Sequence, residues 1–348
     1  MSASAELRLP RVAGLEGARC VLVGGAGFIG SSLTRVLLLS GAEVLVYDNL
    51  ATGATANLEG CAAETGREPA FQHGDVRDEE KLARTLPGSR FVFNLACLGV
   101  RHSIHSPRAN HEVNASGALV LLAQAQEAGV ERLVHVSSSE VYGTARTAPM
   151  TEDHPTDPHT VYGASKLAGE CYARAFHRCH GFAAVVLRPF NAYGPRSHHE
   201  GDSGEVIPRF VVRALARQSL VVFGDGTQTR DLTHVYDTAA AIARAAVAPG
   251  VAGRTLNVGS GIELSVNQLA ELVRRVTGGE GVAIEHAPPR PGDVLRLVAD
   301  SSRAESTLGH RWTISLEAGV RDLVERTRKL GPERVAALAA AIRVRNWE

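Results

Sequence analysis

The chain has 348 residues, of which 44% are hydrophobic, and its 37 lysines and arginines balance its 37 aspartates and glutamates. This length and apolar content suit one large α/β domain with a smaller appended lobe. A formal net charge of zero gives no positive field to attract nucleic acid, so we expect no nucleic-acid partner.

Membrane and secretion signals are missing from the sequence pattern. No apolar run approaches the ~18 to 20 residues of a membrane span, and no basic and apolar leader with a cleavage site begins the chain. The five cysteines show no pairing framework, so we expect reduced thiols without a disulfide. We therefore expect a cytoplasmic protein with no membrane partner.

Short apolar runs alternate with helical patterns in the first half of the chain. The runs have the composition of strands that are covered on both faces, and the segments between them have helical spacing and length. The expected strands are residues 20–23, 44–47, 91–95, 133–136 and 184–187, and the expected helices are residues 29–39, 112–127 and 163–177. This βαβ series predicts an α/β fold with a doubly wound parallel Rossmann sheet over residues 18–190.

The alternation of strand and helix patterns ends at residue 191, after which Gly and Pro clusters interrupt the chain. Helical patterns return at residues 206–217, 237–247 and 266–277. We expect residues 191–330 to form mainly a smaller C-terminal α/β substrate lobe, with part of them returning to the Rossmann domain. Residues 331–348 are expected to form a C-terminal helix that packs on the core or on a second subunit.

A glycine-rich turn marks the start of the first helix. Gly24, Gly27 and Gly30 follow an expected strand and open a helix, where they permit a tight turn, close approach of pyrophosphate and close helix packing. Asp48 ends the next strand, 18 residues after Gly30, and can accept hydrogen bonds from a ribose. Because no Arg or Lys follows in residues 49–53 to hold a 2′-phosphate, the pattern favours NAD over NADP. Asp75, in the segment between the expected strands at residues 44–47 and 91–95, is a candidate contact for adenine.

Tyr162 and Lys166 are four residues apart, so a helix projects both from one face. A free phenol, with a pKa of about 10, is a poor base at neutral pH, but a neighbouring ammonium and a cationic nicotinamide both favour phenolate. The pair therefore predicts oxidation of a carbinol, with Tyr162 as the base.

Polar residues follow the expected strand at residues 133–136. Ser138, Ser139 and Glu140 lie at its carboxyl end, which faces the ligand crevice in an open parallel sheet. They are candidates to touch substrate. The alternative is that the serines cap a turn and that Glu140 is solvated.

These motifs resemble those of the extended short-chain dehydrogenase/reductases, in their nucleotide-sugar epimerase, dehydratase and decarboxylase group. The resemblance covers residues 19–312. The motifs in chain order are GGAGFIG, YDNLATG, GDVRD, NLAC, SSSEVYG, YGASK, RPFNAYGP, VIPRF, FGDGTQTRD, HVYD and RPGD.

The resemblance implies roles for individual residues. Ser138, Tyr162 and Lys166 correspond to the catalytic triad of the family, with Ser139 and Glu140 beside it, and Asn114 to a structural or active-site asparagine. The implied NAD contacts are Gly24, Gly27, Phe28, Ile29, Gly30, Asp48, Asn49, Asp75, Val76, Leu95, Ala96, Tyr162 and Lys166. The implied contacts with the nucleotide diphosphate and base are Asn191, Val206, Phe210, Phe223, Arg230, Arg290 and Asp293. A UDP-sugar is the favoured substrate, and a homodimer through residues 112–127 and 163–177 is implied.

In this family the sugar is oxidised at carbon 4, and three reactions can follow. Elimination needs a positioned carboxyl, so Glu140 favours a nucleotide-sugar 4,6-dehydratase. A UDP-sugar 4-epimerase and a UDP-glucuronate decarboxylase remain alternatives, the latter needing an arginine for the substrate carboxylate near Arg296. The triplet Ser138-Ser139-Glu140 differs from the Thr-Asp-Glu of the dTDP-glucose dehydratases at Ser139.

A non-catalytic NAD sensor is the alternative of a different class, although sensors typically lose the Tyr/Lys pair. We expect no metal site. His198, His199 and Glu200, with Asp202, lack any known ligand spacing and are expected to lie in a solvated loop.

Overall fold

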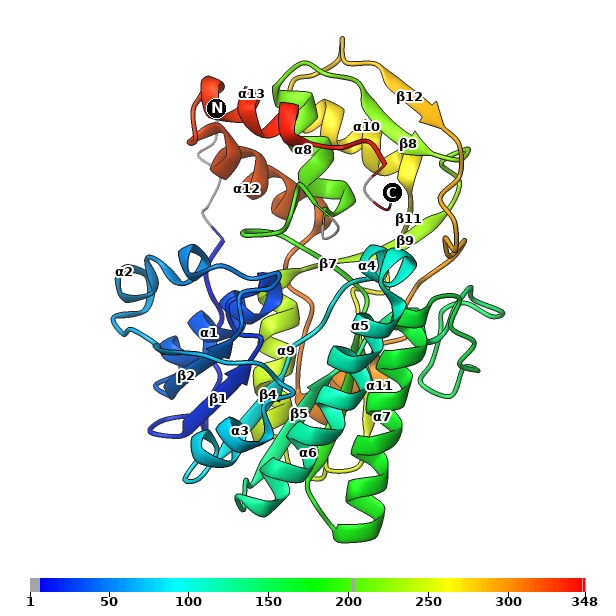
Figure 1. Cartoon of the computed structure of the whole chain (residues 1–348). Coiled ribbons are helices and arrows are strands. Elements are labelled where there is room, and N and C mark those ends of the chain that lie inside the picture. The colour runs from blue at the N-terminus through cyan, green and yellow to red at the C-terminus, as the bar shows by residue number, and fades with distance from the viewer. Residues whose placement is uncertain (1–6, 202–203, 346, 348) are drawn as a thin grey trace.

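A parallel sheet forms the centre of the larger lobe of this computed structural model, which describes residues 7–201, 204–345 and 347 (Figure 1). Its seven strands lie in the order β3-β2-β1-β4-β5-β6-β10, so the strand order reverses between β1 and β4. The strands are β1 (Arg19–Val23), β2 (Glu43–Asp48), β3 (Ala70–His73), β4 (Phe91–Asn94), β5 (Arg132–Val136), β6 (Ala184–Pro189) and β10 (Thr255–Val258). This topology confirms the predicted Rossmann sheet.

Helices cover both faces of this sheet because its strands are apolar on both sides. Along β1, Cys20 and Leu22 pack with α1 (Phe28–Leu39) and α9 (Val235–Val247), whereas Val21 and Val23 face the opposite layer. That second layer contains α3 (Glu79–Thr85), α6 (Gly117–Glu127) and α7 (Val161–His180). Shorter elements are η1 (Thr55–Leu58), α2 (Cys61–Thr65), α4 (Val100–His105), α5 (Pro107–His111), η2 (Glu112–Ser116), η3 (Ser139–Val141) and α11 (Ser302–Leu308).

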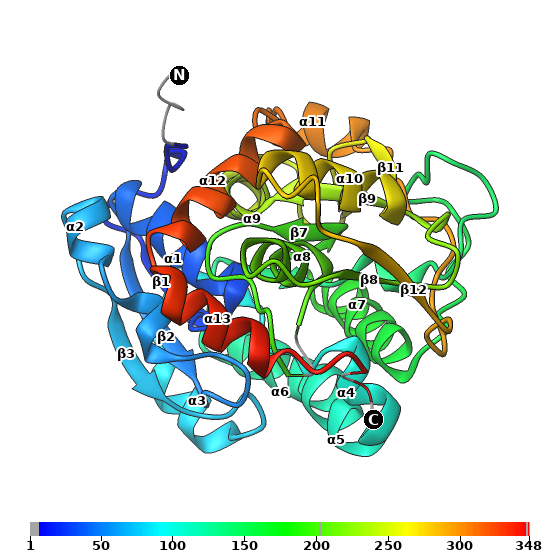
Figure 2. The ribbon, with the colours of Figure 1, turned by 90° about the horizontal axis from the view of Figure 1, so that it is seen from above.

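A smaller lobe lies over the carboxyl ends of the strands (Figures 1 and 2). Its helix α8 packs against α10 and α12 around a separate apolar core, and against α13 through a smaller apolar cluster. Its strands are β7 (Asn191–Tyr193), β8 (Leu220–Phe223), β9 (Thr229–His234), β11 (Glu263–Ser265) and β12 (Ile284–Ala287), and its helices are α8 (Val206–Leu215), α10 (Val266–Val276), α12 (Leu316–Arg328) and α13 (Pro332–Ala341). The chain returns from this lobe to the large sheet through α9 and β10.

Two local features differ from the sequence expectation. The helix expected over residues 112–127 is interrupted at its start by the π-helical turn η2, which precedes α6. The edge strand β10 was not expected at all. Within the described residues no helix is long and apolar enough to cross a bilayer. All five cysteines are free.

Candidate active site

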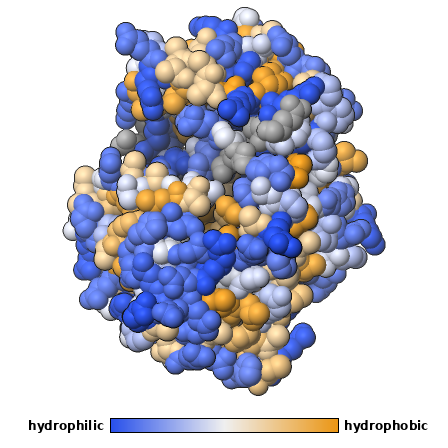
Figure 3. Space-filling view, in the orientation of Figure 1, coloured by the Kyte–Doolittle hydropathy of each residue, from blue (hydrophilic) through white to orange (hydrophobic). Residues whose placement is uncertain are grey.

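A cavity of about 530 Å³ lies between the two lobes. In the space-filling view the surface is hollowed between the upper and the lower lobe (Figure 3). The carboxyl ends of the parallel strands form its floor, as expected at the point where the strand order reverses. Of the site residues expected from the sequence, Asp75, Asn114 and Arg296 do not line this cavity and the others do.

The glycine-rich turn has the geometry that pyrophosphate binding requires. Gly24 has a φ of +86°, and a Cβ there would lie 2.6 Å from the backbone nitrogen of Ala96. At Gly30 a Cβ would meet the carbonyl oxygen of Gly24. Gly27 is the N-cap of α1. The free backbone N–H groups of the first turn of this helix attract phosphate, and no acidic residue in that turn opposes them. The residues present therefore fit a dinucleotide.

Asp48 ties this turn to the end of β2. Its Oδ2 accepts the backbone N–H of Ala26 at 2.9 Å, and its Oδ1 accepts that of Leu50 at 2.8 Å. A carboxylate can accept about four hydrogen bonds, so two positions are left for ribose hydroxyls. Asp48 thus has a structural role in addition to the expected ribose contact.

Asp75 lies outside the cavity lining, whereas its neighbours Gly74 and Val76 are part of it. The guanidinium of Arg77 binds both Asp75 oxygens at 2.8 Å and lowers the pKa of this carboxyl, and Asn49 donates to Oδ2 at 2.8 Å. Because Asn49 and Arg77 both line the cavity, Asp75 orients them there.

The catalytic residues expected from the sequence converge at the junction of β5 and α7. Ser138 hydrogen-bonds Tyr162, whose pKa is raised by burial. Lys166 is 3% exposed, and its Nζ donates to the carbonyl of Val136 at 2.6 Å. Burial lowers the pKa of this ammonium. Since an ammonium has three donor positions, the one bond to Val136 fixes Lys166 beneath Tyr162 and leaves two donors for a ligand.

Glu140 lies in the same cavity, beyond Ser138. Burial raises the pKa of its carboxyl, while the nearby charges of Arg230 and Arg290 oppose the shift. No described side chain hydrogen-bonds this carboxyl. The carboxyl of Glu140 therefore faces the cavity and is placed for acid or base chemistry on a ligand.

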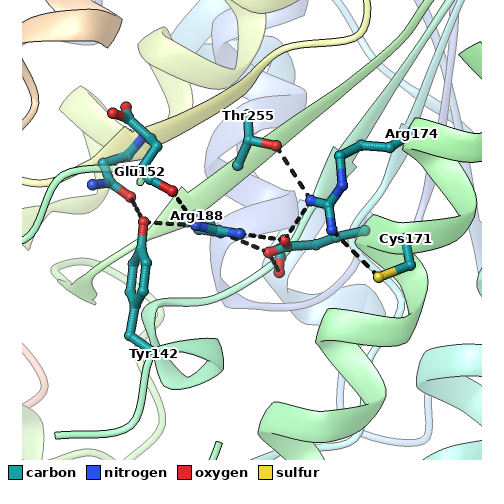
Figure 4. A network of polar contacts seen from close by, with 9 residues as sticks. Tyr142, Glu152, Cys171, Arg174, Arg188 and Thr255 are labelled. Atoms are coloured by element: carbon teal, nitrogen blue, oxygen red, sulfur yellow. Dashed lines mark hydrogen bonds and ion pairs between the residues drawn. The ribbon is translucent and has the colours of Figure 1, made fainter. Parts of the chain in front are cut away.

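A buried network of hydrogen bonds and ion pairs around Glu170 and Arg188 connects α7 to the end of β5 (Figure 4). Glu170, on α7, accepts hydrogen bonds from Ser137 at 2.6 Å and from two nitrogens of Arg188 at 2.9 and 2.6 Å. Arg188 also donates to the hydroxyl of Tyr142 at 2.8 Å, and Arg174 donates to Glu170 at 3.0 Å. The sequence reasoning missed this network. Its one available signal was that Glu170 follows Lys166 by four residues and so shares a helix face with it.

A second set of buried hydrogen bonds fixes the loop after β4. Asn114, in the π-helical turn, accepts the N–H of Leu98 at 2.9 Å and donates to Asn110 and Ser165. Asn114 does not line the cavity, so of its two possible roles the structure favours the structural one. This loop carries Cys97 into the lining, close enough to influence the pKa of Tyr162 and of Lys166.

The smaller lobe supplies the opposite wall. Asp293 binds Arg230 at 2.6 Å and Arg290 at 2.5 Å through the same oxygen. This carboxylate therefore positions both guanidinium groups. The Oδ1 of Asn191 is buried without a described partner and belongs to the same lining. Val206, Phe210 and Phe223 line the cavity beside them, as expected.

More arginines reach this wall than the sequence reasoning had identified. Arg101, Arg209 and Arg213 also line it. Burial, together with Arg290 and Arg209, lowers the pKa of Arg101 to about 9. Several guanidinium groups that repel one another in a buried space form a strong site for a polyanion such as a diphosphate. Arg209 belongs to the VIPRF motif, whereas no sequence signal marks Arg101 and Arg213, because surface arginines look the same.

Three sequence expectations fall outside the site or need correction. Arg296 pairs with Glu263 at 2.6 Å on the surface and does not line the cavity, so it is not placed to bind a substrate carboxylate. His198 is wrongly expected in a solvated loop, because it lines the cavity and packs edge-on to Phe28. Asp202 lies outside the described residues. Among the described residues no cluster of three His, Cys, Asp or Glu side chains could hold a metal.

Comparison with known proteins agrees with this geometry. Residues 21–323 match the family model described as GDP-mannose 4,6 dehydratase. A putative UDP-glucose 4-epimerase of Methanocaldococcus jannaschii is 34% identical over 87% of this chain and 96% of its own length. A dTDP-glucose 4,6-dehydratase of Streptomyces niveus is 33% identical over 88% of this chain and 92% of its own length.

Solved structures show the same mixture of activities. The UDP-glucose 4-epimerase of Thermotoga maritima, solved with UDP-glucose, has a TM-score of 0.84 at 33% identity and covers 90% of this chain and 99% of its own. The dTDP-glucose 4,6-dehydratase of Streptomyces venezuelae, solved with NAD, has a TM-score of 0.84 at 35% identity. The match covers 92% of this chain and 99% of that structure. The chain therefore belongs to the extended short-chain dehydrogenase/reductase family of nucleotide-sugar epimerases and dehydratases, and it is an enzyme of that family.

Proposed function

We propose that this enzyme is an NAD-dependent nucleotide-sugar 4,6-dehydratase that acts on a UDP-sugar. The observation that carries the proposal is the carboxyl of Glu140, which lies in the cavity with Ser138, Tyr162 and Lys166 and has no described hydrogen-bond partner. Epimerisation at carbon 4 needs no such group, whereas elimination needs a carboxyl that can accept and return a proton.

The glycine turn and Asp48 would hold NAD, which supplies the acceptor and later the donor of a hydride. Tyr162 accepts the proton of the sugar 4-hydroxyl, with Ser138 hydrogen-bonded to it and Lys166 favouring its phenolate. The resulting 4-keto group acidifies the proton on carbon 5. Glu140 removes that proton and donates one to the departing carbon 6 hydroxyl, which leaves as water.

The arginine-rich wall supports a nucleotide diphosphate as the carrier of the sugar. Arg230 and Arg290 are fixed by Asp293, so little side-chain freedom is lost when phosphate binds. Their planar forks match phosphate oxygens.

A 4-epimerase is the second candidate, because relatives with that activity match as well as the dehydratases do. A decarboxylase is less supported, since Arg296 is engaged at the surface with Glu263. A 4-epimerase gives Glu140 no essential role.

We further propose a cytoplasmic homodimer formed through α6 and α7. Leu119 on α6 is 41% exposed, and Val161 on α7 is 39% exposed. Light scattering after size-exclusion chromatography should show a dimer that Leu119→Asp converts to a monomer. Leu295→Asp, at a 66% exposed leucine outside these helices, should leave the dimer intact.

Product analysis tests the reaction. The purified enzyme, incubated with UDP-glucose, UDP-N-acetylglucosamine, UDP-glucuronate, dTDP-glucose and GDP-mannose, should convert a UDP-sugar into a product that has lost one water. Glu140→Gln should abolish this product, while Tyr162→Phe should slow every conversion by about 10²- to 10⁴-fold. An isomer of unchanged mass, made equally well by Glu140→Gln, would identify an epimerase, and loss of carbon dioxide would identify a decarboxylase.

A further inference from the structure

An aromatic side chain from the far end of the chain lines the cavity. Trp347 lies against Phe223, with ring centroids 4.9 Å apart and ring planes at 74°. Phe223 ends β8 in the smaller lobe. The family model ends at residue 323, so Trp347 comes from a segment beyond it.

The segment that delivers Trp347 is anchored to the smaller lobe. Helix α13 packs on α8 through an apolar cluster of Val212, Leu338, Ala339 and Ile342. After the helix, the guanidinium of Arg209 donates to the carbonyls of Arg343 at 2.6 Å and of Val344 at 3.1 Å. Figure 1 shows the chain running from α13 toward the crevice between the lobes. The position of Trp347 is therefore set by packing and hydrogen bonds just before it.

The two lobes contribute different chemistry to the cavity. The larger lobe supplies the glycine turn, Glu140 and Tyr162, and the smaller lobe supplies most of the arginines. Beside the arginines the lining becomes apolar, with Phe210, Val221, Phe223 and Val266 joined by Trp347. A ligand whose diphosphate meets the arginines would place its nucleobase among these apolar side chains.

We propose that Trp347 forms one wall of the subsite for the nucleobase, an inference that rests on the proposed nucleotide-sugar substrate. Two rings at nearly a right angle make a corner, in which a base can stack on one ring and direct its edge at the other. Stacking stabilises any base because every base has a π-face. Trp347 thus adds affinity for the nucleotide, whereas the choice of base depends on the polar groups around it.

Intrinsic fluorescence offers a direct test, because the chain has only two tryptophans. Trp312→Phe leaves Trp347 as the sole indole, and Trp312 packs against His310 away from the cavity. With NAD present, UDP, dTDP and GDP are titrated into this variant. Quenching of Trp347 that saturates with the same dissociation constant as calorimetric binding is the expected result.

Substitution of Trp347 completes the test. Trp347→Ala should weaken binding of the nucleoside diphosphate by about 5- to 100-fold and raise KM for the nucleotide sugar, with kcat within about twofold. Trp347→Phe should restore most of the affinity, and the affinity for NAD should not change.

Each of the following outcomes would overturn the inference. Unchanged affinity in Trp347→Ala would show that the indole does not touch the base, and tighter binding would show that it obstructs the subsite. Absence of quenching would contradict contact directly. If the unaltered enzyme bound none of the three nucleotides, the proposed function itself would fail, and this inference with it.

Discussion

Replacement of Glu170 by Gln tests whether the buried network behind the active site stabilises the fold and orients the catalytic groups. Glu170 is completely buried and Arg188 is 4% exposed, so neither charge can be solvated in the folded state. Glutamine keeps the size of the side chain but removes the negative charge that faces Arg188 and Arg174. The guanidinium of Arg188 would then be buried without a counterion.

The expected cost follows from this burial. Removing one partner of a buried ion pair typically costs about 3–5 kcal/mol, because the remaining charge has lost its compensation. A domain of this kind is stable by only about 5–15 kcal/mol, so the loss is large. Hydrogen bonds to Arg188, Ser137 and Arg174 outweigh burial and lower the pKa of Glu170 below its ordinary value of 4.5. The stabilisation is therefore present above pH 4.5 and declines as the pH falls further.

Urea unfolding followed by circular dichroism measures the effect at pH 7 and pH 4. A matched control is Glu131→Gln, since Glu131 pairs with Arg90 at 2.6 Å but both side chains are about half exposed. That surface pair should contribute about 0–1 kcal/mol. If Glu170→Gln costs no more than Glu131→Gln, or if its cost does not shrink at pH 4, the reasoning is wrong.

The same variant should affect catalysis. Ser137 precedes Ser138, and Glu170 lies one helical turn after Lys166, so loosening the network displaces both sides of the catalytic group. We expect kcat to fall by about 10- to 100-fold, because small displacements of reacting groups are costly. Binding of UDP and NAD should change little. A normal kcat in a destabilised variant would limit the network to a role in folding.

Three further predictions concern the two walls of the cavity. Tyr162→Phe should lower kcat by about 10²- to 10⁴-fold without weakening binding of NAD or UDP, as measured by steady-state kinetics and calorimetry; retained turnover would exclude Tyr162 as the base. Gly24→Ala should destabilise the fold and abolish NAD binding because its Cβ would clash with Ala96, whereas Gly27→Ala, whose Cβ would have no described contact closer than 3.5 Å, should unfold at the same urea concentration as the unaltered enzyme. Burial raises the pKa of Glu205 to about 8, so this side chain destabilises the fold increasingly as the pH rises from 4.5 toward 8. The free energy of unfolding of Glu205→Gln should therefore exceed that of the unaltered enzyme by up to about 5 kcal/mol at pH 9 and by nothing at pH 4. An equal gain at both pH values would contradict this.

The NAD half of the site could be predicted from sequence because its requirements are local. A phosphate turn needs glycines at fixed spacing between a strand and a helix, and Tyr162 and Lys166 need only one helical turn. Strands that are covered on both faces can likewise be recognised in the sequence as apolar runs. Asp75 shows the limit of this reasoning, since a motif position does not reveal that Arg77 binds the carboxylate outside the lining.

The substrate half depends on contacts between distant segments. Arg230 and Arg290 are 60 residues apart and meet at Asp293, and Arg101 reaches the same wall from the other lobe. The edge strand β10 was missed for the same reason, because its pairing with β6 follows from the return of the chain through α9. No local pattern distinguishes such residues from surface residues of the same type.

The choice among reactions depends on Glu140 more than on any other group in the cavity. Ser139 stands where the Thr-Asp-Glu triplet of the dTDP-glucose dehydratases has an acidic residue, and it is 3% exposed. A serine hydroxyl cannot supply a proton to the departing carbon 6 hydroxyl as a carboxylic acid can, so both proton transfers of an elimination fall to Glu140. A single carboxyl can perform both if it takes the carbon 5 proton first and returns it on the same face of the sugar. The raised pKa of Glu140 suits this order of proton transfers. A carboxylate whose conjugate acid has a higher pKa is a stronger base toward the carbon 5 proton, and the carboxyl then keeps that proton until the carbon 6 hydroxyl departs.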